Sequence, residues 1–138
     1  MKDTLIIVCS GTGFAPKALT FLEKQVGEYN DYDVLAIPGG IHSLCVTAFL
    51  PKYKWAISHW VKFLVETHNL KRVIALDHDD CAWFEKLSIA ESAVMGKSQY
   101  YSLNRARETL LSLLPDGIAL EVWRAYNEND EIKFEKVK

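Results

Sequence analysis

The sequence contains few of the residues that define the more specialised protein classes. Its 138 residues include three cysteines, two methionines and four prolines, and the formal net charge is only −2. A small, odd number of cysteines argues against a disulfide framework and raises the question of metal binding or catalysis. A nearly balanced charge provides no basic surface for nucleic acid or for an anionic membrane. We therefore predict no nucleic-acid partner and no membrane partner.

Long apolar runs are also missing. No run approaches the roughly 20 residues that span a bilayer, and the apolar stretch at residues 5–9 is too short for the core of a signal peptide. Hydrophobic residues make up 49% and charged residues 25% of the chain, which is typical of a globular protein. We expect one cytoplasmic domain over residues 1–138, large enough to bury a core without covalent staples.

Three short apolar runs predict strands that are buried on both faces. They are rich in β-branched residues and occupy residues 5–8, 34–37 and 73–76. Between and after them, apolar residues recur at a spacing of three and four, which predicts helices. The expected helices begin at Pro16, near Lys54 and after Ser102, and end near Gly27, Asn69 and Pro115.

The end of the chain has a different pattern. Residues 118–126 and 132–137 are strand-like runs on either side of a polar segment, which predicts a hairpin. The resulting order of strands and helices belongs to the α/β class. It predicts a mostly parallel sheet flanked by helices, with an antiparallel C-terminal edge strand.

Potential metal ligands follow two of the predicted strands. Cys9 directly follows the first strand, and His78 and Cys81 follow the third. Ligands in such sheets gather beyond the carboxyl ends of the strands. If the two strands are neighbours, their spacing of about 4.8 Å lets one ion bridge them. Two thiolates and one imidazole leave a fourth position open, as in catalytic zinc sites. The alternative is that Cys9 simply fills space in the core.

Three segments resemble the β-class carbonic anhydrases. That family has C-x-D-x-R after its first strand and H-x-x-C after its third, and the corresponding segments here are residues 7–13 (IVCSGTG) and 73–82 (VIALDHDDCA). Between them, residues 33–40 resemble the family's second strand and glycine turn. The resemblance implies a β-carbonic anhydrase-like domain that binds Zn²⁺ through Cys9, His78 and Cys81. It also implies a homodimer, which the aromatic content favours too.

The chain departs from this family at an important pair. Gly11 and Gly13 stand where the family has the aspartate and arginine that orient the zinc-bound water and accept its proton. Two thiolates neutralise Zn²⁺, so such a site needs a hydrogen-bond partner for its water. We therefore keep two hypotheses. The protein hydrates CO₂, or a related small electrophile such as carbonyl sulfide, by zinc-bound hydroxide, or it is a diverged relative that binds zinc without catalysis.

The candidates to replace the missing pair are Ser10, Thr12, His42, Asp79 and Asp80, of which we select His42 and Asp80 as the catalytic residues. His42 follows the second predicted strand, and an ordinary imidazole pKa near 6.5 suits proton transfer. The alternatives are an exposed loop position for His42 and a helix-capping role for Asp79 and Asp80. Asp77 could instead accept a hydrogen bond from the His78 ring.

Two other patterns are weaker. His42 and Cys45 form a second H-x-x-C, in which we interpret Cys45 as a core residue because an apolar stretch follows. The turn from Ser10 to Gly13 resembles the start of a flavodoxin phosphate loop. Phe14, however, stands where that loop needs a polar donor. A phosphate- or flavin-binding module is therefore the less favoured alternative.

Overall fold

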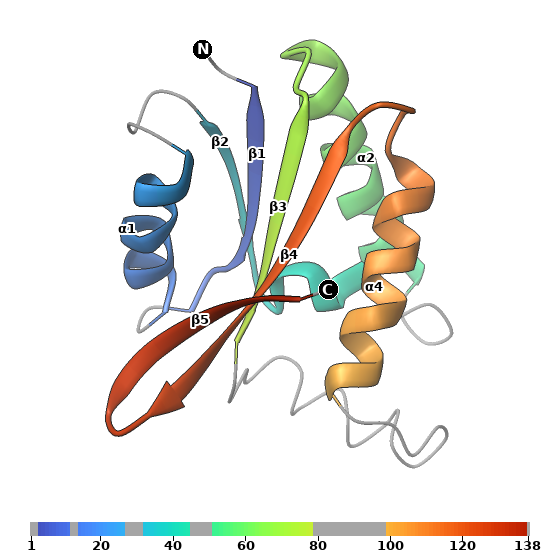
Figure 1. Ribbon diagram of the computed structural model, residues 1–138. Helices are drawn as coiled ribbons and strands as arrows, with labels where there is room; N and C mark the ends of the chain where they lie inside the picture. The colour runs from blue at the N-terminus through green and yellow to red at the C-terminus, as the bar shows by residue number, and fades with distance from the viewer. Residues whose placement is uncertain (1–2, 12–13, 27–31, 45–50, 79–98, 138) are drawn as a thin grey trace.

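The computed structural model describes residues 3–11, 14–26, 32–44, 51–78 and 99–137, and a five-stranded sheet forms its centre (Figure 1). The sheet order is β2-β1-β3-β4-β5. The strands are β1 (Thr4–Cys9), β2 (Tyr32–Ile37), β3 (Arg72–His78), β4 (Ala119–Glu128) and β5 (Glu131–Val137). All neighbours are parallel except β4 and β5. The predicted mixed α/β sheet with an antiparallel edge strand is confirmed.

Helices cover both faces of this sheet (Figure 1). Helix α1 (Ala15–Val26) lies on one face, and α2 (Pro51–Thr67) and α4 (Gln99–Leu113) lie on the other. A short 3₁₀ helix, η2 (Gly40–Leu44), packs against β1, β3, α2 and α4. Two helices begin earlier than predicted. Helix α2 starts at Pro51, because proline's fixed φ suits the first helical position, and α4 starts at Gln99.

Two hydrophobic cores lie on opposite sides of β1 and β3. Every residue of β1 is buried, as are the five central residues of β3. Leu5, Ile7 and Ala75 face the core under α2 and α4, whereas Ile6, Ile74 and Leu76 face the core under α1. This arrangement explains why the two strands are continuous apolar runs rather than alternating ones.

Aromatic contacts attach α1 to the C-terminal hairpin. The ring of Phe21 stacks on that of Phe134 with centroids 4.0 Å apart, and it meets Trp123 edge-on at 5.6 Å. The hairpin turns at Asn129 and Asp130, whose φ angles of 51° and 60° match the left-handed positions of a tight hairpin turn. The hairpin therefore closes the edge of the core under α1.

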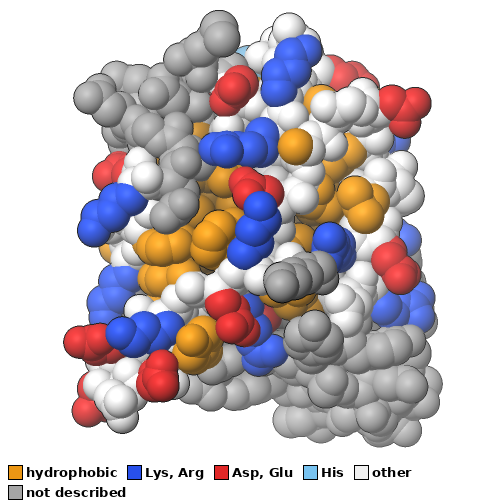
Figure 2. Space-filling view, viewed as in Figure 1, with side chains coloured by type: hydrophobic (Ala, Val, Ile, Leu, Met, Phe, Trp, Pro, Cys, Tyr) orange, Lys and Arg blue, Asp and Glu red, His pale blue; other side chains and the backbone are white. Residues whose placement is uncertain are grey.

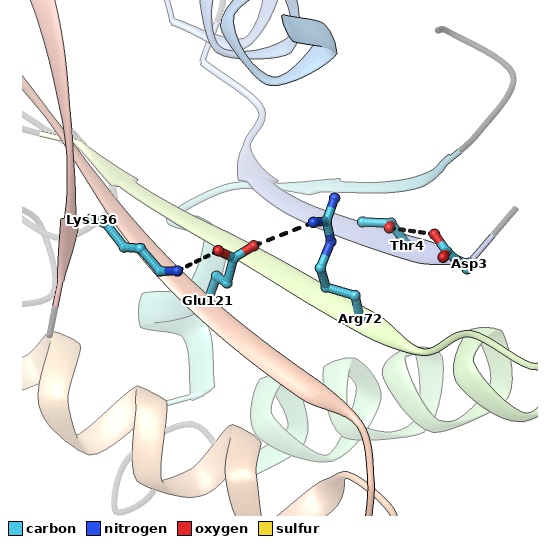
Figure 3. A network of polar contacts seen from close by, with 5 residues as sticks. All are labelled: Asp3, Thr4, Arg72, Glu121 and Lys136. Atoms are coloured by element: carbon cyan, nitrogen blue, oxygen red, sulfur yellow. Dashed lines mark hydrogen bonds and ion pairs between the residues drawn. The ribbon is translucent and has the colours of Figure 1, made fainter. Parts of the chain in front are cut away.

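Polar contacts join neighbouring strands at the opposite end of the sheet (Figure 3). Glu121 on β4 lies 2.5 Å from Lys136 Nζ on β5 and 3.8 Å from Arg72 Nη1 on β3. At the start of β1, the Thr4 hydroxyl donates to Asp3 at 2.8 Å.

His68 was expected on the long helix but lies one residue past it, where its Nδ1 contacts Asp33 Oδ2 on β2. Such exposed pairs contribute at most about 1 kcal/mol each.

The visible surface carries mixed charge. Lysine and arginine are interspersed with aspartate and glutamate over the face shown in Figure 2. This face therefore has no field of one sign, in keeping with the nearly balanced sequence. Among the described residues, no helix is long and apolar enough to cross a membrane.

Gly40 brings the turn after β2 against the ends of β1 and β3. Its φ is +52°, and a Cβ added there would lie 3.0 Å from the backbone nitrogen of Cys9 and 3.4 Å from the carbonyl oxygen of Leu76. A side chain at this position would thus be both strained and in collision with backbone. Only glycine lets η2 approach the strand ends this closely.

We predict that Gly40→Ala destabilises the protein by about 2–5 kcal/mol, from left-handed strain and overpacking together. Gly117→Ala is the matched control, because Gly117 also has a positive φ, of +87°, but has nothing within 4 Å of an added Cβ. It should cost only about 1 kcal/mol. Urea unfolding measures both values, and equal losses would contradict the close approach at Gly40.

Candidate metal centre

Cys9 and His78 end two neighbouring parallel strands. Strands β1 and β3 pair with Ile7 opposite Ala75, so continuing the register places Cys9 level with Asp77 and one residue short of His78. Neighbouring strands lie about 4.8 Å apart. The first and third strands are neighbours, which is the condition that a shared metal site requires, and β2 lies on the outer side of β1.

The thiol of Cys9 lies at the edge of the core under α1. Cys9 is only 6% exposed and belongs to the buried cluster that includes Phe14. Its Sγ is 3.9 Å from the position that a Cβ of Gly11 would occupy. The thiol therefore lies beside the turn that follows β1. In that turn, Gly11 stands at the position where the resemblance implies an aspartate.

Phe14 holds the imidazole ring of His78. The two rings stack with centroids 4.2 Å apart and planes inclined by 20°. Phe14 is itself 6% exposed, and the backbone nitrogens of Phe14 and Ala15 donate to the carbonyl oxygen of Gly11 at 3.1 and 2.9 Å. The Nε2 atom of His78 has no exposed surface. The same cluster thus contains Cys9 and fixes the orientation of His78.

Asp77 lies on the other face of the sheet. Successive residues of a strand point to opposite faces, and His78 continues the α1 side while Asp77 continues the side of α2 and α4. The Asp77 carboxylate is buried, and its Oδ2 is 4.0 Å from Nε of Arg124, its register partner on β4. The ion contact that the structure shows at Asp77 is therefore with an arginine rather than with the His78 ring.

The remaining predicted site residues fall partly outside the described residues. Cys81, Asp79, Asp80 and Cys45 all lie beyond them, and of His42 only the backbone is described, within η2 against β1 and β3. In the described ranges, no group of three or more His, Cys, Asp or Glu residues could hold a metal ion. The third ligand of the predicted set therefore stays a prediction.

The two described donors suit zinc by their chemistry. A thiolate sulfur and an imidazole nitrogen are ligands that Zn²⁺ prefers, and tetrahedral sites combine them readily. Ring stacking on Phe14 fixes the orientation of the His78 ring. Glycine at position 11 leaves the space beside the Cys9 sulfur open.

Sequence reasoning missed Phe14 and Arg124. An apolar residue before a helix carries no signal of stacking on a distant histidine. Arg124 could be paired with Asp77 only through the register of β3 and β4, which the sequence does not define.

Comparisons with known proteins begin with sequence relatives. No family model matches the chain. An uncharacterized protein of Rickettsia bellii is 31% identical over 99 residues, which cover 68% of this chain and 59% of that protein. A second uncharacterized protein, from Rickettsia conorii, is 27% identical over 99 residues, covering 68% and 52%. The chain thus spans between half and three-fifths of the relatives it matches.

Solved structures define the fold class. A carbonic anhydrase of Streptococcus mutans has a TM-score of 0.57 at 15% identity, covering 99% of this chain and 84% of that one. A β-carbonic anhydrase of Trichomonas vaginalis has a TM-score of 0.51 at 14% identity, covering 95% and 80%. A carbon disulfide hydrolase has a TM-score of 0.52 at 13% identity, covering 96% and 77%. The protein therefore has the fold of the β-carbonic anhydrases.

We predict that Asp77 and Arg124 stabilise one another across β3 and β4. Arg124→Met removes the arginine that lies 4.0 Å from the buried carboxylate, which should cost about 1–3 kcal/mol. In the double variant with Asp77→Asn, the two losses should fall short of additive by about 0.5–3 kcal/mol. Chemical unfolding measures this cycle. Glu131 and Lys133, whose side chains pair at 2.9 Å on the exposed hairpin, serve as the control cycle. Strict additivity at Asp77 and Arg124 would contradict the prediction.

Proposed function

We propose that this protein binds one zinc ion through Cys9, His78 and Cys81. The observation that supports the proposal is the juxtaposition of Cys9 and His78 at the carboxyl ends of β1 and β3, within a β-carbonic anhydrase fold. Cys81 is three residues beyond His78, close enough in sequence to reach the same ion. Cys9 ends β1 and Cys81 follows β3 in the sequence, so the ion would also tie β1 to the segment after β3.

Bound zinc would supply a Lewis acid that activates water for attack on a small electrophile. The chain's own residues would prepare the site for this chemistry. Phe14 holds the His78 ring in one orientation and excludes solvent from its face. We propose His42 and Asp80 as the groups that carry protons to and from the site. Gly40 sets the approach of the His42 backbone by allowing η2 to contact the strand ends.

The substrate class we propose is a small neutral electrophile, with CO₂ as the first candidate. Two kinds of fold neighbour support this class, since one is named a carbonic anhydrase and another a carbon disulfide hydrolase. Carbonyl sulfide lies between those two substrates chemically and belongs in the same panel. A single domain over residues 1–138, a homodimer and a cytoplasmic location complete the proposal.

A specific observation favours a second candidate, which is zinc binding without turnover. The space beside the Cys9 sulfur is bordered by Gly11 instead of a carboxylate. Without a group that fixes the water and accepts its proton, a site with two thiolates loses much of the benefit of general base catalysis, typically about 10²–10⁴-fold. The metal would then serve stability or binding.

Zinc content tests the ligand set directly. Purified protein should contain about one zinc per chain by elemental analysis, and Cys9→Ser, His78→Ala and Cys81→Ser should each reduce it strongly. Cys45→Ser is the matched control, because we interpret Cys45 as a core residue, and it should keep the metal. A cobalt-substituted sample should show thiolate-to-metal charge-transfer absorption. Unchanged zinc in Cys81→Ser would refute the ligand set.

Hydration of CO₂ separates the two candidates. We expect the zinc-loaded wild type to hydrate CO₂ measurably in a stopped-flow assay, and Cys81→Ser to lose the rate. Restoring the family's pair with Gly11→Asp and Gly13→Arg should raise the rate by about 10²-fold. An added Cβ at Gly11 has only an ordinary contact with the Cys9 sulfur, so Gly11→Asp should be tolerated. A zinc-loaded wild type without any rate on CO₂, carbonyl sulfide or carbon disulfide would favour the non-catalytic candidate.

A further inference from the structure

Helix α2 presents large aromatic side chains to solvent. It packs against the sheet through Ile57, Val61 and Val65, all of which are buried. Four aromatic side chains project from its remaining surface and are exposed by 42%, 73%, 51% and 48%: Tyr53, Trp55, Trp60 and Phe63. Proteins that act alone rarely expose a contiguous patch of this kind, and such patches usually mark an interaction site.

The exposed rings form an ordered row along the helix. Trp55 stacks on His59 with centroids 6.1 Å apart and planes 17° apart. His59 meets Trp60 edge-on at 5.6 Å, and Trp60 meets Phe63 edge-on at 6.4 Å. Rings that already hold one another lose less conformational freedom when a partner covers them. The row is therefore preorganised for binding.

The outermost stripe of α2 is symmetric in sequence. Its residues lie seven and four positions before His59 and four and seven positions after it, and all are exposed: Lys52, Trp55, His59, Phe63 and Glu66. Residues at this spacing share one face of a helix. An aromatic residue therefore flanks the centre on each side, and opposite charges stand at the two ends.

From this pattern we infer that a second copy of this chain docks on α2, with the two helices antiparallel and a two-fold axis passing beside His59. In that arrangement Trp55 meets the partner's Phe63, and Lys52 meets the partner's Glu66. A two-fold interface must be complementary to itself, and this stripe satisfies that condition at the two pairs on either side of His59. The inference rests on the homodimer proposed above and not on the metal centre.

Charge favours a second copy over other occupants. An anionic membrane or an acidic protein would select a stripe of one sign, whereas this stripe ends in a lysine and a glutamate. Trp55 and Phe63, the two aromatic residues of the stripe, would bury about 400 Å² over the two copies. The flanking Lys52, His59 and Glu66 side chains, and Trp60 beside Phe63, add to this area.

Charge reversal tests the pairing of the stripe with itself. Sedimentation velocity at micromolar concentration should show the wild type as a dimer. Lys52→Glu and Glu66→Lys should each weaken the dimer about tenfold or more, because like charges then face one another. The double variant should return to within about threefold of the wild type. Lys17→Glu, an exposed reversal on α1, is the matched control and should remain dimeric.

Three outcomes of this experiment would overturn the inference. They are a monomeric wild type, single reversals without effect, and single reversals that the double variant does not rescue. A monomeric wild type that binds vesicles of phosphatidylglycerol would assign the aromatic face to a membrane surface instead. Circular dichroism confirms that each variant is folded, and all three substituted positions are exposed.

A disulfide trap tests the position of the axis. His59→Cys places a thiol beside its own copy across the two-fold axis, so mild oxidation should give a covalent dimer. Glu66→Cys is the control, because the two copies of residue 66 would lie about 21 Å apart along the antiparallel helices and should not cross-link. Wild-type chain, with its native cysteines, measures the background. Equal cross-linking at both positions, or none at His59→Cys, would overturn the two-fold arrangement.

Discussion

The pairing of β1 with β3 is the contact on which the rest of the molecule depends. Both strands are buried on both faces, so each contributes to the core under α1 and to the core under α2 and α4. Parallel pairing in one register also brings Cys9 and His78 to the same end of the sheet. A slip of one residue would exchange the two faces of a strand, burying the wrong side chains and separating the two donors. Stability and the proposed site therefore have the same origin.

The candidate metal centre differs from the pattern of its fold class in its surroundings. Gly11 leaves the space beside the Cys9 sulfur open, while Phe14 closes the face of the His78 ring. An acid and an arginine do occur close together, as Asp77 and Arg124, but on the face of the sheet away from His78. The acid and the arginine that the structure shows at this end of the sheet therefore lie on β3 and β4 and not beside the Cys9 sulfur. This arrangement makes metal binding a better-supported proposal than turnover.

The surface shown in Figure 2 carries charges of both signs between apolar side chains. On α2, a row of exposed aromatic rings lies along the helix, with one stacked contact and two edge-on contacts. Since η2 contacts α2 as well as β1 and β3, an interface on α2 would also restrain the backbone beside the strand ends. Oligomer formation and the stiffness of the site would then be connected through one short helix.

The sequence by itself determined the elements and their class. The runs at residues 5–8, 34–37 and 73–76 predicted buried strands because apolar β-branched residues stabilise them locally, and the strand-end position of Cys9 and His78 followed directly. Tertiary structure decided the side-chain contacts that depend on strand register and on the packing of segments distant in the sequence. It stacked Phe14 on His78, paired Asp77 with Arg124 and placed His68 on Asp33 instead of within a helix. It also left Trp55 and Trp60 exposed, because helical periodicity locates a buried face only once the sheet it covers is known.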